Sequence, residues 1–284
     1  EEGNNIESVN KKGYRLAEKP DDILSSENIA YNLPTEFIGK KVIHLDTVGS
    51  TNDYAKEIGN KVSGGTLIIS EQQTKGKGRL GRVWKSKSGD GIWMSLIIKP
   101  KIEPYKAPFL TLVAGASVVK ALSNLGVEAS IKWPNDIIVH NKKICGILTE
   151  LSAEMERVNY VVIGIGINIK TIDFPDEIKE KATSLYKEGY KLSRVDIVRQ
   201  FCIEFEKLYK GYILDGNKQD TLELCRKYSA IIGKQVYVIK NNKRELVKCI
   251  DINENGNLIV KEKNGEIQEI MSGEVSIRGV KGYV

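Results

Sequence analysis

The chain has 284 residues, of which 41% are hydrophobic and 28% are charged. This composition is typical of globular proteins and excludes wholesale disorder, and the length predicts about two compact units with a small extra module. Lys and Arg total 43 against 37 Asp and Glu, so the net charge is +6. The modest excess favours an anionic small molecule or an acidic partner and does not by itself indicate nucleic-acid binding.

The four cysteines, Cys145, Cys202, Cys225 and Cys249, stand in no Cys-x-x-Cys or Cys/His ligand spacing. We therefore expect buried, reduced thiols in a cytoplasmic protein and no structural zinc site. No apolar run approaches the roughly 20 residues of a membrane span, and there is no signal peptide, so we expect no membrane association. Because the chain does not begin with Met, we expect it to be a fragment of a longer protein.

Residues 1–20 are polar, and two short extended pieces flank a Lys-Lys-Gly turn, which predicts a small hairpin. Residues 21–230 hold strands and helices that do not strictly alternate, which favours an α+β domain. A helix capped at Ser25 is expected first, with Pro34 as a breaker. The later elements are expected as strands over 42–45, 66–70, 92–98, 130–133, 136–140, 143–151 and 160–169 and helices over 51–59, 107–125, 193–211 and 217–230.

Residues 231–284 differ from the rest of the chain because their β-rich runs are short and closely spaced. Asn/Gly turns separate these runs, so we expect a small antiparallel barrel as a separate C-terminal domain. The strands are expected over 235–239, 246–251, 258–261 and 274–277.

The loop 74–82 interleaves three glycines with four cations, Lys75, Lys77, Arg79 and Arg82. It contains G-x-G-x-x-G, but it neither follows the predicted strand directly nor opens a helix, which argues against a dinucleotide-binding turn. It also lacks the Lys-Ser/Thr pair of a Walker loop. Glycines allow the backbone to approach a ligand, and the cations favour phosphates. We expect the empty loop to be mobile because its cations repel, and a merely solvated basic loop remains an alternative.

Three further segments carry polar groups at strand ends or a helix start. Lys132, in Lys132-Trp133-Pro134-Asn135-Asp136, lies among apolar strands and needs an anion unless it extends to the sheet edge. Ser50-Thr51-Asn52 caps a helix, and its amides and hydroxyls can also bind a polar head group. Gly164 and Gly166 indicate close approach of a ligand or, alternatively, tight packing against a helix.

Taken together, these segments resemble the biotin–protein ligases, a family whose bacterial members often also repress the biotin operon. Six segments occur in the family's order, over about residues 6 to 284. They are Ser50-Thr51-Asn52, 71–82 (Glu71 to Arg82), 132–136, Lys143-Ile144-Cys145-Gly146-Ile147-Leu148, 164–168 and Gly273-Glu274-Val275-Ser276-Ile277-Arg278.

The resemblance implies a mixed-sheet catalytic domain of the class II synthetase-like fold over 21–230 and an SH3-like barrel over 231–284. It implies that biotin and MgATP give biotinyl-5′-AMP and pyrophosphate, after which the biotinyl group passes to a lysine of a carrier domain. Biotin and ATP with Mg²⁺ are then substrates, and no tightly bound cofactor or fixed metal site is expected.

The resemblance also implies roles for individual residues. Lys132 and Arg79 are the expected catalytic residues, because their charge would stabilise the carboxylate and the α-phosphate during in-line attack. Biotin is expected to contact Ser50, Thr51, Asn52, Gln73, Lys77, Gly78, Arg79 and Lys132. The nucleotide is expected to contact Arg79, Arg82, Trp84 by stacking on adenine, Asn135, Asn168, Thr183 and Ser184.

Two departures from the family pattern stand out. Lys77 occupies a position that is usually Arg, which keeps the charge but loses the bidentate fork. Residues 1–20 resemble only the wing of a winged helix-turn-helix, so we expect operator DNA to bind only through an upstream domain. The expected protein partners are a carrier domain of acetyl-CoA carboxylase or pyruvate carboxylase and, on adenylate binding, a second copy of the chain.

Two alternatives differ in chemistry. A lipoate or octanoate ligase or transferase shares the fold, but its Arg-Arg-x-Ser-Gly-Gly-Gly segment is not found here, and a transferase needs an acyl-accepting cysteine, for which Cys145 is the nearest candidate. A biotin sensor that represses without ligating would not need an adenylating lysine such as Lys132.

Overall fold

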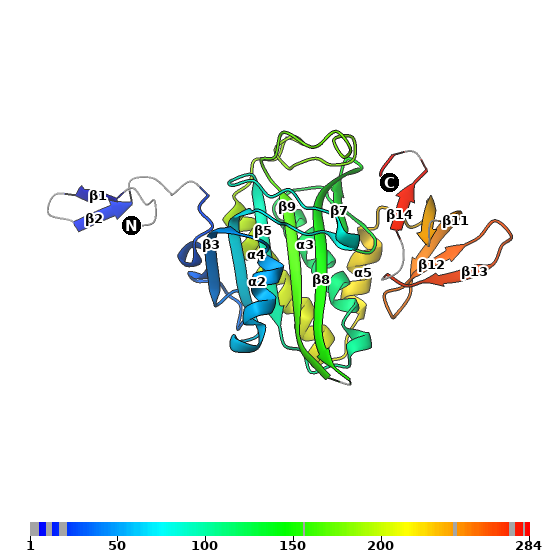
Figure 1. Cartoon of the computed structure of the whole chain (residues 1–284), viewed down its shortest axis with the longest axis horizontal. Coiled ribbons are helices and arrows are strands. Elements are labelled where there is room, and N and C mark those ends of the chain that lie inside the picture. Colours follow the sequence, from blue (N-terminus) through cyan, green and yellow to red (C-terminus); the bar gives the residue numbers. More distant parts are fainter. Residues whose placement is uncertain are drawn as a thin grey trace.

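The computed structural model describes most of the chain and shows two bodies of secondary structure, with a short strand pair at the N-terminal end (Figure 1). The described residues are 6–9, 13–16, 22–155, 157–240, 243–272, 276–280 and 282–284. Strands β1 (Ile6–Val9) and β2 (Gly13–Leu16) pair antiparallel. They confirm the two paired extended pieces expected in this segment, whereas its interpretation as a wing stays a prediction.

A seven-stranded mixed sheet forms the larger body, in the order β3-β4-β5-β9-β8-β7-β6. β3 and β4 are parallel, and the other neighbours are antiparallel, which confirms the mixed sheet. The strands are β3 (Val42–Val48), β4 (Thr66–Gln73), β5 (Gly91–Ile98), β6 (Ser130–Lys132), β7 (Asp136–Val139), β8 (Lys142–Glu154) and β9 (Arg157–Asn168). β5 is buried along its whole length because helices cover both faces of the sheet.

Helix α2 (Thr51–Ile58) covers one face of this sheet, and α3 (Phe109–Asn124), α4 (Arg194–Leu214) and α5 (Gln219–Lys227) lie over the other (Figure 1). Strand residues alternate accordingly: Ile68 and Ile97 pack with α2 in a small cluster, while Leu67 and Leu96 belong to the main core. α1 (Ser26–Ala30) begins after its cap Ser25, as predicted.

The region of α3 is apolar enough to be considered as a membrane span. Residues Pro104–Asn124 have the length and hydropathy of one, but 72% of the most apolar window is buried inside the protein. α3 packs against α4, α5 and the sheet, so its apolar surface is explained as the central helix of the core.

The smaller body is a five-stranded antiparallel sheet, in the order β13-β12-β11-β10-β14. Its strands are β10 (Gln235–Lys240), β11 (Lys243–Ile252), β12 (Leu258–Lys261), β13 (Ile267–Ile270) and β14 (Ser276–Gly279). The antiparallel strands are confirmed; among the described residues the ladder runs from β13 to β14 without closing between them. β13 was not predicted because only one of its residues is even half-buried. The predicted strand over 274–277 falls partly outside the described residues.

A turn of the C-terminal sheet docks into the larger body. Gly256 lies at a positive φ of 82°, and a Cβ there would approach the Leu112 side chain to 2.4 Å. Its carbonyl accepts a 3.0 Å hydrogen bond from the buried Trp133 indole. Arg226, at the end of α5, donates to Asp251 at 2.8 Å. These contacts fix the C-terminal sheet beside β6 and β7.

The four cysteines are all buried and unpaired, as expected. Burial raises the pKa of the Cys145 thiol, so this sulfur is held in its unreactive protonated form.

Candidate functional site

Two cavities meet at the glycine-rich loop, and they differ in chemistry. The first, here called the polar pocket, has a volume of about 40 Å³. Its lining includes neutral polar residues at the start of α2 and on β4, glycines of β8 and β9, apolar strand side chains and the cations Lys77, Arg79 and Lys143. The second, here called the cationic cavity, has a volume of about 660 Å³ and lies between the large sheet and the C-terminal sheet. Both are lined by Gly78, Arg79, Trp84, Asn135 and Lys143.

Hydrogen bonds at the start of α2 build the polar pocket. Ser50 caps the helix, and the backbone amide of Thr51 donates to Gln73 Oε1 at 2.9 Å. The Thr51 hydroxyl reaches the same oxygen at 3.1 Å. Gln73 Nε2 in turn donates to Ser86 at 2.8 Å. The predicted biotin-contacting residues on α2 and β4 are therefore brought together and held in one network.

Asn52 is oriented by two side chains that the sequence reasoning did not single out. Its Oδ1 accepts from the Ser95 hydroxyl at 2.5 Å, and its Nδ2 donates to Glu150 Oε2 at 2.7 Å. Ser95 is fully buried in β5 and also lies 2.7 Å from the Thr51 hydroxyl. A lone serine within the apolar run Ile92–Ile98 was a detectable signal, whereas nothing in the sequence connects Glu150 to Asn52.

Glycines form the floor of the polar pocket because any side chain there would collide. A Cβ at Gly164 would lie 2.2 Å from Asn52 Oδ1, and one at Gly166 would lie 2.5 Å from the Trp84 indole nitrogen. Gly164 therefore packs against helix α2, as the packing interpretation expects, and Gly166 lies against the Trp84 side chain, while close approach of a ligand to these glycines stays a prediction. A Cβ at Gly146 would also approach Trp84, to 2.9 Å.

Trp84 closes the polar pocket in this conformation. The indole lies on Gly146 and Gly166, and its buried Nε1 has no hydrogen-bond partner among the described residues. A pocket of about 40 Å³ holds a few waters at most, so a ligand of biotin's size requires this side chain to move.

The glycine-rich loop is not a dinucleotide turn, as expected. β4 extends to Gln73, so the loop begins closer to the strand than predicted, but only the short 3-10 turn η2 (Arg79–Gly81) follows. The expected repulsion among its cations is relieved at two positions. Lys77 forms an ion pair with Asp53 at 2.6 Å, and Arg79 donates to Asn135 at 2.7 Å and to the Ser272 carbonyl at 2.6 Å.

Lys132 is the central charged group of the cationic cavity. Its side chain is 2% exposed, and Nζ has no hydrogen-bond partner among the described residues. Burial lowers the pKa of Lys132 to about 7; Asp136 opposes this shift, and Arg278, Lys143 and Arg82 add to it. A buried, unpaired ammonium surrounded by like charges is a site for an anion.

The neighbouring carboxylate is already occupied. Asp136 forms an ion pair with Lys143 at 2.5 Å and accepts a hydrogen bond from the Tyr283 hydroxyl. Burial alone would raise the pKa of Asp136, but Lys143 and Tyr283 outweigh it and lower the pKa. Asp136 therefore stays ionised beside the cavity.

Most predicted nucleotide contacts line the cationic cavity, but two do not. Arg79, Arg82, Trp84, Asn135 and Asn168 lie in its wall. Thr183 and Ser184 are buried behind the wall, where Asn168 Nδ2 donates to the Thr183 carbonyl at 3.1 Å. Thr183 therefore supports Asn168, and neither residue lines the cavity in this structure.

The residues predicted to contact biotin are divided between the two cavities. Ser50, Thr51, Asn52, Gln73 and Lys77 line the polar pocket, together with the shared Gly78 and Arg79. Lys132 lines only the cationic cavity, at the far side of the shared wall.

The cavity also contains residues to which the sequence reasoning gave no site role, although two of them lie in the family segment 273–278. Arg278 and Ile277 come from β14, and Tyr283 follows them in the chain. A tyrosine near the end of the sequence carries no signal of this placement, since only the docking of the C-terminal sheet brings it to Lys132. Within the described part of the chain, no cluster of three or more His, Cys, Asp and Glu side chains is placed to hold a metal ion.

Known proteins resemble this chain in sequence and in fold. The model of the biotin/lipoate A/B protein ligase family matches residues 45–168, and that of the biotin protein ligase C-terminal domain matches 231–278. The bifunctional ligase/repressor BirA of Bacillus subtilis (strain 168) is 41% identical over 281 residues, which cover 97% of this chain and 86% of the relative. The biotin–[acetyl-CoA-carboxylase] ligase of Mycobacterium tuberculosis is 34% identical over 51% of this chain and 56% of its own length.

A solved structure supports the same assignment. The biotin protein ligase of Aquifex aeolicus, in complex with biotin and ATP, superposes with a TM-score of 0.74 at 32% identity, covering 84% of this chain and 99% of that one. The mixed sheet with its paired cavities is thus the fold of a ligase that joins a small carboxylic acid to protein. On the identity and coverage of these relatives, the chain belongs to the biotin protein ligase family.

Proposed function

We propose that this chain activates biotin with MgATP to biotinyl-5′-AMP and transfers the biotinyl group to a lysine of a carrier domain. The observation that carries the proposal is the buried Lys132 ammonium, which has no hydrogen-bond partner among the described residues, in a cavity that shares a wall with the polar pocket. The arrangement suits a ligand with an uncharged polar head and a carboxylate that reacts with a nucleotide.

The polar pocket suits the ureido ring of biotin. This ring offers one carbonyl acceptor and two N–H donors, and the pocket presents hydroxyl, amide and backbone groups of Ser50, Thr51, Asn52 and Gln73. Because these groups are already fixed by hydrogen bonds, binding costs little side-chain ordering. Lys77, Gly78 and Arg79 would cover the ring after Trp84 has moved from the glycine floor.

In the first step, a biotin carboxylate oxygen attacks the α-phosphorus of ATP, a P–O bond forms, and pyrophosphate leaves with its bonding electron pair. Lys132 and Arg79 would stabilise negative charge on the carboxylate and the α-phosphate, and Arg82, Asn135 and Asn168 would position the nucleotide. Mg²⁺ enters with ATP as part of the substrate and shares the charge of its phosphates. Approach of an anion raises the pKa of Lys132 from about 7, so the lysine is protonated when it is needed.

In the second step, the lysine amine of the acceptor attacks the acyl carbon, an amide forms, and AMP leaves while the amine loses a proton. The name of the Mycobacterium relative supports acetyl-CoA carboxylase as the source of the acceptor domain, with pyruvate carboxylase as the other candidate. The name of the Bacillus relative supports an additional role as a repressor of transcription. A dimer formed on adenylate binding, operator contact through an upstream domain, and a cytoplasmic location complete the proposal.

The sister activities are disfavoured by specific observations. Cys145, the nearest candidate for an acyl-accepting thiol, is 0% exposed, and burial raises its pKa, so it is a poor nucleophile. A sensor without catalysis would leave the buried charge of Lys132 without a purpose that offsets its cost.

ATP–pyrophosphate exchange, with biotin, lipoate and octanoate compared at equal concentrations, tests the proposal. We expect exchange only with biotin. Exchange with lipoate or octanoate would assign the chain to the sister ligases, and biotin binding without exchange would support the sensor.

A further inference from the structure

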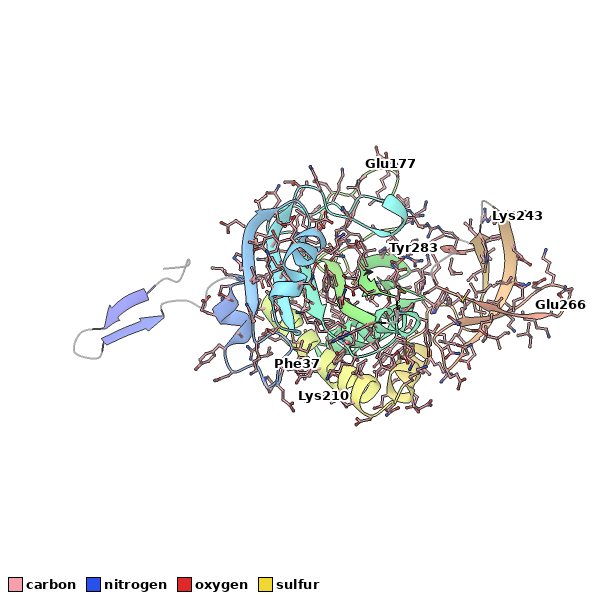
Figure 2. All side chains as sticks on the ribbon, turned by 60° about the horizontal axis from the view of Figure 1, so that its bottom comes forward. Phe37, Glu177, Lys210, Lys243, Glu266 and Tyr283 are labelled. Carbon is pink, nitrogen blue, oxygen red and sulfur yellow. The ribbon has the colours of Figure 1, made fainter. Side chains whose placement is uncertain are left out.

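Tyr283 is a residue of the C-terminal segment that enters the cavity of the large sheet. Figure 2 labels it between the large sheet and the C-terminal sheet, away from Lys243 and Glu266 at the outer end of the latter. Its carbonyl accepts a 3.3 Å hydrogen bond from the Gly279 amide at the end of β14. The segment is therefore anchored to the C-terminal sheet while the ring reaches the catalytic lysine.

Lys132 and Asp136 are expected to pair but do not. They are direct cross-strand partners in the β6–β7 ladder, and opposite charges at such positions attract each other. Lys132 Nζ nevertheless has no hydrogen-bond partner among the described residues, and the ion pair of Asp136 is with Lys143.

Tyr283 contacts both members of this missing pair. Its hydroxyl donates to Asp136 Oδ2, and its ring centroid lies 3.2 Å from Lys132 Nζ. Asp136 Oδ2 thus accepts a hydrogen bond from Tyr283, and Oδ1, which has no hydrogen-bond partner among the described residues, forms the ion pair with Lys143. The aromatic face holds the Lys132 ammonium by a cation–π contact, which is weaker than a buried ion pair and gives way to an incoming anion.

We infer that Tyr283 is a positioning residue that keeps the Lys132 ammonium apart from Asp136, so that it remains available to the carboxylate and α-phosphate of the substrates. The inference rests on the proposed function, because it takes Lys132 as the group that meets these anions. It adds to that function a residue of the C-terminal sheet that sets the charge state of the site.

The charged groups around Lys132 determine how loss of Tyr283 would be seen. Among the described residues, the charged groups that act on Lys132 are one anion, Asp136 on β7, and three cations: Lys143 on β8, Arg82 after the glycine-rich loop and Arg278 on β14. If Asp136 were released to Lys132, the ion pair would raise the pKa of the lysine above its present value of about 7. Tyr283 itself does not titrate in this range, since burial and then Asp136 raise its pKa well above the usual value.

The central variant is Tyr283→Phe, which keeps the ring and removes the hydroxyl from Asp136. We expect kcat/KM for pyrophosphate exchange to fall roughly tenfold at pH 7, because Lys132 must leave Asp136 before it meets the substrates. The alkaline limb of kcat/KM, where Lys132 loses its proton, should move up by about one pH unit. The ¹³Cε signal of Lys132, assigned by its absence in Lys132→Arg, should titrate correspondingly higher in the substrate-free protein.

A double variant separates positioning from general damage. If Tyr283 acts by occupying Asp136, removal of the aspartate charge in Tyr283→Phe/Asp136→Asn should return the Lys132 titration to or below its original midpoint. Asp136→Asn alone gives the baseline for that comparison. Tyr212→Phe is the matched control, because it removes the hydroxyl of another buried tyrosine. Tyr212 lies on α4, away from Lys132, and its hydroxyl donates to the Lys106 carbonyl at 3.0 Å.

The outcomes are distinct. An unchanged Lys132 titration in Tyr283→Phe overturns the inference, as does a uniform loss of activity at every pH that Asp136→Asn does not rescue. If Tyr283→Phe does not fold, Tyr283→His, which keeps a ring and a donor, should retain the original titration, and a raised midpoint there would contradict the inference. If the unaltered protein lacks biotin-dependent exchange, the proposed function fails, while the ¹³Cε titration still decides the role of Tyr283.

Discussion

The polar pocket and the cationic cavity share a wall but differ in how their polar groups are satisfied. In the polar pocket, Thr51, Asn52 and Gln73 are all hydrogen-bonded to protein partners. In the cationic cavity, Lys132 has none among the described residues. A neutral head group can be recognised by a network that exists before binding, whereas recognition of an anion requires a charge left uncompensated until the anion arrives.

Removal of the uncompensated charge should have the largest effect. We expect Lys132→Met to lower the rate of biotin-dependent pyrophosphate exchange by roughly a thousandfold, because a charge that acts on the transition state is lost. Biotin affinity, measured by calorimetry without ATP, should change far less, since the lysine does not line the polar pocket. Lys207→Met, at an exposed position of α4, is the control. An equal loss of binding and rate would mean that Lys132 chiefly binds biotin.

A side chain added to the glycine floor should weaken ligand binding in the polar pocket without a direct effect on the cationic cavity. Gly164→Ala places a Cβ 2.2 Å from Asn52 Oδ1, so Asn52 must shift. We expect biotin to bind roughly 30- to 100-fold more weakly, which corresponds to the loss of one or two hydrogen bonds. Gly115→Ala is a matched control, because its nearest neighbour would lie at an ordinary 3.8 Å. Unchanged biotin affinity in Gly164→Ala would show that Asn52 is not a ligand contact.

The same Lys132→Met variant should be more stable than the unaltered chain. The folded-state pKa of Lys132, about 7, lies below the ordinary lysine pKa of 10.5, so folding opposes the charged form. The cost is fully present below pH 7 and disappears as the pH rises toward 10.5. We expect a gain of about 1–3 kcal/mol in the free energy of unfolding at pH 6, shrinking at alkaline pH, in urea titrations. Lower stability at pH 6 would contradict an unpaired charge.

The smallest effect is expected from removal of the Ser95 hydroxyl, which lies behind the polar pocket. Ser95→Ala removes hydrogen bonds to Asn52 and Thr51 without creating a collision. We expect biotin affinity to fall about five- to tenfold with little change in the maximal exchange rate. Ser117→Ala, a buried serine of α3 that donates to the Val113 carbonyl, should leave affinity unchanged. A fall in the maximal rate with unchanged affinity would place the role of Ser95 elsewhere.

The same contrast explains what could be predicted from sequence. Ser50-Thr51-Asn52 is one short segment, and its capping chemistry alone indicated a site for a polar head group. The role of Gln73 was implied only by the family resemblance, and the contacts of these residues with biotin stay predictions. Most strands were also predicted, since runs such as Ile92–Ile98 are continuously apolar and buried. Thr183 and Ser184 do not line the cavity in this structure, because a segment near the site can lie one layer behind it, and their contact with the nucleotide stays a prediction.

The residues that were missed depend on contacts across the fold. Glu150 acts through Asn52, nearly a hundred residues earlier in the chain. Tyr283 acts through the docking of one sheet against another, and β13 is too exposed to show an alternating pattern. These contacts exist only in the folded molecule, so they cannot be predicted from the composition or spacing of nearby residues.

The hydrogen bond from Trp133 to the turn at Gly256 joins the C-terminal sheet to the larger body, and this connection affects unfolding. Because Arg278 and Tyr283 complete a cavity whose other walls belong to the large sheet, an occupant of that cavity touches both bodies at once. Its binding free energy is then available only while both are folded and joined. A saturating occupant therefore favours unfolding of the two bodies in one cooperative transition, because neither can unfold without loss of its binding free energy.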